Sequence, residues 1–144
     1  MRNHKSKVKT SKILKKAIDF HGHLGPYLVL GIQMGNLAID RLKCKRHFGI
    51  RTEVKGAVNK PKSCLIDGIQ VATGCTYGKG NIQKEEGSRI QAIFQNLQNN
   101  KKIKLFLKQD LIKKLDSLKG YKDSELFALE LFASEPDGLF EIKF

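Results

Sequence analysis

The sequence has few cysteines and no long apolar run, and each shortage excludes a class of protein. Its 144 residues include three cysteines, Cys44, Cys64 and Cys75, an odd number without the spacing of a disulfide framework. We therefore expect reduced thiols and a cytoplasmic protein. No apolar run reaches the roughly 20 residues that a membrane-spanning helix requires. No apolar stretch typical of a signal peptide follows the basic N-terminus either, so we expect no membrane association.

Acidic residues are also scarce over most of the chain. Residues 1–122 hold 26 Lys and Arg against 8 Asp and Glu, whereas residues 123–144 hold 1 against 6. A basic body with an acidic end suggests nucleic acid, a small anionic ligand or a second copy of the chain as partners. The lysines are scattered, however, and no RNP, zinc-finger or basic-zipper pattern is present. We therefore regard nucleic acid as the weaker hypothesis and a diffuse lysine-rich surface as the simpler explanation.

The apolar pattern predicts a single α+β domain over residues 1–144, with a mainly antiparallel sheet packed with helices. The helix over residues 26–43 is apolar on almost all sides through Ile39, which predicts a buried central helix. Residues 1–10 should form a flexible basic arm. The remaining expected elements are helices over 12–20, 64–73, 111–118 and 123–133 and strands over 50–58, 89–97, 102–107 and 139–144.

Two of the four histidines lie close together in the stretch from Phe20 to Pro26 (FHGHLGP). Pro26 suits the first turn of a helix, so His21 and His23 should lie in the loop before it. Residues two positions apart in an extended segment share a face, so both rings can approach one ligand. The alternative is that one histidine caps the helix and the other packs against the core.

A second group of candidate residues opens the helix that begins at Ser63 or Cys64. Cys64 and Asp67 are three positions apart and share a helix face. Thiolate, carboxylate and imidazole groups are suitable ligands for zinc or a similar transition metal. We expect the helix N-terminus to lower the pKa of Cys64. Burial as a small apolar residue is the competing explanation for each cysteine, and a Cys–His nucleophile would lack an identifiable third, orienting group.

The glycine-rich segment from Gly74 to Asn81 follows this helix. Its backbone N–H groups could bind an anion, with Lys79 as the counter-charge, although a plain helix-ending turn is the competing interpretation. Cys75 lies about three turns beyond Cys64, so both cysteines can join one site only if the helix ends early.

These two segments, FHGHLGP and CLIDGIQVATGCTYGKGN (residues 64–81), together resemble the FmdE family of formylmethanofuran dehydrogenase proteins. The resemblance covers about residues 12–110. It implies an α+β core domain, often dimeric, from archaea and anaerobic bacteria. It also implies a link, by name, to the molybdenum- or tungsten-dependent enzyme that fixes CO2 onto methanofuran, and so to methanogenesis.

The resemblance also assigns residues. It marks His21, His23 and Cys64 as metal ligands, with zinc expected and nickel or iron as alternatives. The residues it places in the surrounding pocket are Asp67, Gln70, Cys75 and Lys79.

Two departures from the family pattern qualify this assignment. Many members have a cysteine where this chain has Gly25, so one sulfur ligand is missing. Many also carry a C-terminal zinc finger, and no cysteine follows Cys75 in this sequence, so we expect the core domain without that module.

We therefore expect a metal-binding core protein linked to one-carbon, methanofuran or related redox metabolism. Its partners would be a second copy of the chain and other formylmethanofuran dehydrogenase subunits, and whether it catalyses a reaction itself stays open. One alternative is a basic accessory or nucleic-acid-associated protein with a vestigial metal site. Another is a purely structural role within a dimer.

Overall fold

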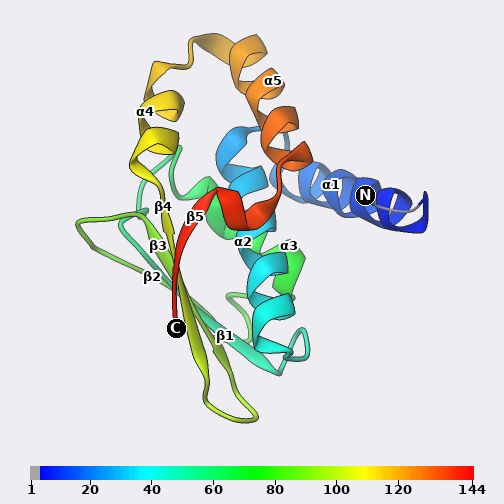
Figure 1. Ribbon diagram of the computed structural model, residues 1–144, viewed down its shortest axis with the longest axis vertical. Coiled ribbons are helices and arrows are strands. Elements are labelled where there is room, and N and C mark those ends of the chain that lie inside the picture. The colour runs from blue at the N-terminus through cyan, green and yellow to red at the C-terminus, as the bar shows by residue number, and fades with distance from the viewer. Residues whose placement is uncertain (1–3) are drawn as a thin grey trace.

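The computed structural model describes residues 4–144, with side-chain surroundings from residue 12 onward, and shows helices packed against a five-stranded sheet (Figure 1). The predicted α+β class is confirmed. The helices are α1 (His4–His21), α2 (Pro26–Leu42), α3 (Cys64–Thr73), α4 (Gln109–Ser117), α5 (Gly120–Ala133) and a short 3-10 helix, η1 (Pro136–Gly138). The strands are β1 (Ile50–Lys55), β2 (Ile82–Glu85), β3 (Gln91–Asn96), β4 (Lys102–Leu107) and β5 (Phe140–Lys143).

The sheet is mainly antiparallel, as predicted, in the order β2-β1-β3-β4-β5. Only the pairing of β1 with β2 is parallel, with Thr52 aligned to Ile82. Strand β2 was not predicted. Ile82 is its only buried residue, so the apolar alternation that identifies a strand is missing.

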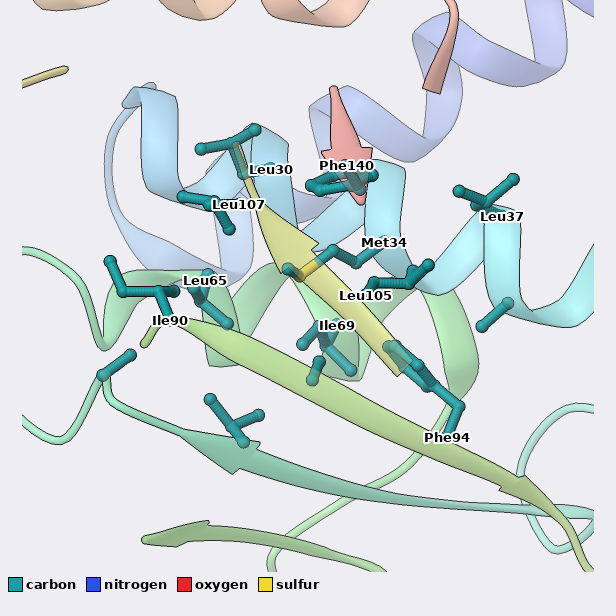
Figure 2. Close-up of a cluster of buried hydrophobic side chains, with 14 of the residues drawn as sticks. Leu30, Met34, Leu37, Leu65, Ile69, Ile90, Phe94, Leu105, Leu107 and Phe140 are labelled. Carbon is teal, nitrogen blue, oxygen red and sulfur yellow. The ribbon is translucent and has the colours of Figure 1, made fainter. Parts of the chain in front are cut away.

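Helix α2 is the buried central helix that the sequence predicted. Its residues Leu30 and Met34 are fully buried in the main hydrophobic core. In Figure 2 the side chains of α2 meet those of α3, such as Leu65, and those of the sheet, such as Phe94 and Leu105. The sheet contributes to this core because alternate residues of β1 and β3 face inward.

Helices α2 and α3 touch through their backbones at glycines. A Cβ atom at Gly31 would overlap the carbonyl oxygen of Leu65, and one at Gly68 would overlap the carbonyl oxygen of Leu28. Further along, a Cβ at Gly35 would lie against Ala72. Successive contacts therefore advance together along both chains, which means that the two helices run parallel and begin at the same end.

A buried glutamine fixes α5 to α2. The side-chain amide of Gln33, which is 3% exposed, donates to the backbone oxygens of Leu131 at 2.7 Å and Ser134 at 3.2 Å. These carbonyls belong to the end of α5, where intrahelical donors run out. The arch of α4 and α5 at the top of Figure 1 is thereby anchored to the central helix.

The N-terminal boundary differs from the prediction, because α1 begins at His4 and not at residue 12. Of the predicted flexible arm, residues 1–3 lie outside the described part of the chain, and residues 4–10 have helical backbone. The flexibility of the arm stays a prediction. Within residues 4–144 we find no helix with both the length and the apolar character needed to cross a membrane.

The backbone contact between α2 and α3 can be tested with Gly31→Ala. The added methyl group has no room against the Leu65 carbonyl, so we expect the free energy of unfolding in urea to fall by about 2–3 kcal/mol. Gly78→Ala is the matched control, because a Cβ there meets nothing within 4 Å. Equal stability of the two variants would contradict the close contact.

Candidate metal centre

His21 is the last residue of α1, and its ring is held by α3. Its Nδ1 lies 2.7 Å from Oδ2 of Asp67. An ionised carboxylate can only accept a hydrogen bond, so Nδ1 is the donor. In the neutral ring, Nε2 is then left as an acceptor with a free lone pair.

The Nε2 atom of His21 is buried without a hydrogen-bond partner among the residues that the structure describes. The side chain of His21 as a whole is only 10% exposed. Leaving a buried polar atom unpaired costs about 1–3 kcal/mol, and such atoms in folded proteins call for a partner. The arrangement therefore indicates that a ligand completes His21.

His23 lies beside His21, as the pattern of the loop suggested. The ring centroids of His21 and His23 are 4.8 Å apart and the rings are tilted by 36°. Gly25 is the N-cap of α2, and no side chain caps this helix, so the alternative in which a histidine caps it is wrong. His23 is exposed to solvent.

Cys64 is the first residue of α3 and is half-buried. Burial raises the pKa of its thiol above the ordinary value, and the Asp67 carboxylate raises it further, while the Lys60 ammonium partly opposes both. The expected lowering by the helix N-terminus was therefore wrong, because desolvation and a neighbouring negative charge outweigh the helix dipole. Cys64 favours the protonated thiol unless a bound cation displaces the proton.

Asp67 supplies the orienting carboxylate that sequence reasoning could not identify for a Cys–His nucleophile. However, Nε2 of His21 has no hydrogen bond to the sulfur of Cys64. Together with the raised pKa of the Cys64 thiol, this disfavours nucleophilic catalysis at this position.

Two cavities meet at His21 and Cys64. The first, which we name the apolar cavity, has a volume of about 370 Å³ and lies between the loop before α2, the start of α3 and the α4–α5 junction. The second, which we name the polar cavity, has a volume of about 610 Å³ and lies between α3, β2 and the loop that precedes α3. Both His21 and Cys64 line both cavities.

The remaining predicted pocket residues divide into two pairs. Asp67 and Gln70 line the polar cavity. Cys75 does not line either cavity, because it is fully buried beyond the end of α3 with its sulfur 3.5 Å from Oγ1 of Thr52. Lys79 lies elsewhere on the surface, with its Nζ 5.4 Å from the ring centroid of Phe48.

The glycine-rich loop also has its backbone N–H groups in use. The N–H of Thr76 donates to Asn81 Oδ1, and those of Lys79 and Gly80 donate to oxygens of Thr76. These internal bonds favour the interpretation as a structural turn over an anion-binding loop. The apolar lining from α4 and α5 and the Lys60 and Lys84 side chains were missed, because no local sequence signal places them here.

Residues 20–133 match the family model described as FmdE, molybdenum formylmethanofuran dehydrogenase operon. The chain belongs to the FmdE family. A crystal structure of an FmdE-like protein of tungsten formylmethanofuran dehydrogenase, from Syntrophus aciditrophicus, has the same fold, with a TM-score of 0.66 and 22% sequence identity. The match covers 93% of this chain and 70% of that one.

A curated relative of this FmdE chain is much longer. It is a "Probable S-adenosyl-L-methionine-binding protein" from Archaeoglobus fulgidus, 33% identical over 81 residues. The match covers 51% of this chain and 20% of the relative, so the chain spans about a fifth of that protein's length.

The donors of this FmdE chain suit a transition metal, but they are not preassembled around one point. Within residues 4–144, no group of three His, Cys, Asp or Glu side chains is already arranged to hold an ion. The buried unpaired Nε2 of His21, with a carboxylate behind Nδ1, is nevertheless the arrangement typical of a metal-binding histidine. His23 or Cys64 would complete the site by a side-chain adjustment.

Tyr27, in the wall of the apolar cavity, provides a test of how dry this region is. Burial, helped by the Asp116 carboxylate, raises the pKa of Tyr27 from 10.0 to about 12. Because the neutral phenol is favoured in the fold, this stability is fully present below pH 10 and is lost as the pH rises toward about 12. We expect the urea midpoint to fall over this pH range and Tyr27→Phe to flatten the decline.

The control is Tyr77→Phe, which changes a tyrosine that is 88% exposed. It should leave the alkaline loss of stability unchanged. A wild-type midpoint that is level between pH 10 and 12 would contradict the buried position of the Tyr27 hydroxyl.

Proposed function

We propose that this FmdE-family chain binds a divalent transition metal, zinc in the first instance, through His21 Nε2, His23 and Cys64. One observation carries the proposal: the Nε2 of His21 is buried and unpaired while Asp67 holds the opposite nitrogen. Carboxylates placed behind metal-binding histidines fix the ring and increase its basicity. Imidazole and thiolate ligands favour zinc, with nickel and iron as alternatives.

The protein residues around this site have separable roles in the proposal. A bound zinc with three protein ligands keeps a position open for water or substrate, which it can polarise as a Lewis acid. Asp67 orients His21, and the apolar cavity keeps bulk water from one side of the site. Lys60 and Gln70 contact whatever enters the polar cavity.

The biological setting follows from family membership. We propose a cytoplasmic role in one-carbon, methanofuran or related redox metabolism, as a homodimer or beside other subunits of a formylmethanofuran dehydrogenase-type oxidoreductase. The name of the family model, which refers to a formylmethanofuran dehydrogenase operon, supports this setting. No observation in the described residues favours the nucleic-acid-associated or purely structural alternatives.

Metal content tests the site directly. Purified protein should contain close to one zinc per chain by elemental mass spectrometry, and the double variant His21→Ala, Cys64→Ser should lose it. Asp67→Asn keeps all three ligands but removes the carboxylate behind Nδ1, so its zinc affinity should fall by about 10–100-fold.

Cys44→Ser is the matched control, because Cys44 is likewise a half-buried free thiol but lines neither cavity. Its zinc content should equal that of the wild type. Equal metal content in the double variant and the wild type would remove the proposed ligands from consideration.

Gly25→Cys tests the geometry from the opposite direction by adding a ligand. A Cβ at Gly25 would lie 3.4 Å from Nε2 of His23, and the extended backbone there accepts any residue. The added sulfur should therefore raise zinc affinity by at least tenfold in a competition with a chelator. Gly78→Cys, at an open position, should leave the affinity at His21 unchanged. No gain with Gly25→Cys would place the metal away from His23.

A further inference from the structure

The two cavities differ sharply in the chemistry of their walls. No Asp, Glu, Lys or Arg side chain of the described residues lines the apolar cavity. Its walls include Leu28 of α2, Leu115 and Leu118 from α4 and its C-terminal end, and Tyr121 of α5. A volume of about 370 Å³ falls in the range of sites for small organic molecules, roughly 300–1,000 Å³. Such a cavity suits an uncharged, hydrocarbon or aromatic group.

The polar cavity carries positive charge that its own residues do not neutralise. Lys60 and Lys84 line it, and its one carboxylate, Asp67, is already bonded to His21. The ammonium of Lys84 is positioned by a 3.1 Å hydrogen bond to the backbone oxygen of Val58. Lys60 lies near enough to the junction of the cavities to lower the pKa of Cys64 against larger opposing effects. This side of the site suits an anionic group.

We propose that the site takes an amphipathic organic anion. Its apolar end occupies the apolar cavity, and its carboxylate or other anionic end lies between Lys60 and Lys84. The reacting group between these ends meets His21 and Cys64, where the two cavities join. This last placement rests on the proposed metal function, whereas the ligand class rests on the cavity walls.

Calorimetric titration with three probes tests the ligand class. The probes are 6-phenylhexanoate, the matched alcohol 6-phenylhexanol, and acetate, each added to the zinc-loaded and the metal-free full chain. We expect 6-phenylhexanoate to bind at least tenfold more tightly than either other probe, because only this molecule fills both cavities. Acetate binding as tightly as 6-phenylhexanoate would overturn the role of the apolar cavity.

Variants on each side separate the two contributions. Lys60→Gln with Lys84→Gln should weaken 6-phenylhexanoate at least tenfold and leave 6-phenylhexanol unchanged, whereas Lys102→Gln with Lys104→Gln, on exposed positions of β4, should change neither. Ser124→Phe places a ring in the wall of the apolar cavity and should weaken both phenyl probes. Ser88→Phe, at an exposed position, is its control. Leu118→Gln offers a second, less bulky change to the same wall.

The measured zinc content of the same samples distinguishes this inference from the proposed function. Zinc-loaded protein that binds none of the probes would overturn the inference and leave the metal site standing. Tight 6-phenylhexanoate binding by a chain that takes up no zinc would support the ligand class and overturn the proposed function. An affinity for 6-phenylhexanoate that the Lys60 and Lys84 changes do not alter would overturn the anionic contact.

Discussion

The close contact between α2 and α3 is the constraint on which the candidate site depends. Gly31 and Gly68 let the two backbones touch, and the parallel direction of the helices puts both N-termini at one end of the molecule. The loop that carries His21 and His23 precedes α2, and Cys64 begins α3. Chemistry-bearing residues far apart in the sequence are therefore brought together by backbone packing and not by a local motif. A pair of larger residues at the glycines would separate the helices and with them the site.

The parts of the fold that could be predicted are those with a strong local pattern. The apolar helix α2 and the hairpin of β3 and β4 each carry their own periodicity, so their positions follow from the sequence. Strand β2 carries none, because three of its four residues face solvent and its pairing with β1 depends on the α3 crossover. The early start of α1 at His4 was missed for a similar reason, since the lysine-rich segment before residue 12 has little apolar periodicity.

For the site, the sequence identified residue types but not their relations. His21, Cys64 and Asp67 were predicted, yet the hydrogen bond between His21 and Asp67 joins α1 to α3 and follows only from tertiary packing. The same limit applies to Cys75, whose motif position suggested a pocket but whose sulfur faces Thr52 in the core. The pKa of Cys64 was misjudged because desolvation is a property of the assembled fold.

The bond from Gln33 to the end of α5 has a consequence for how this family can diversify. Apolar helix contacts tolerate sliding, whereas hydrogen bonds to particular carbonyls set an axial register. The opposite end of α5 supplies Tyr121 and Ser124 to the apolar cavity. The width of that cavity is thus governed by a residue remote from it, like the far end of a lever. Evolution can retune which molecules fit by shifting this register while the histidine and cysteine chemistry is inherited intact.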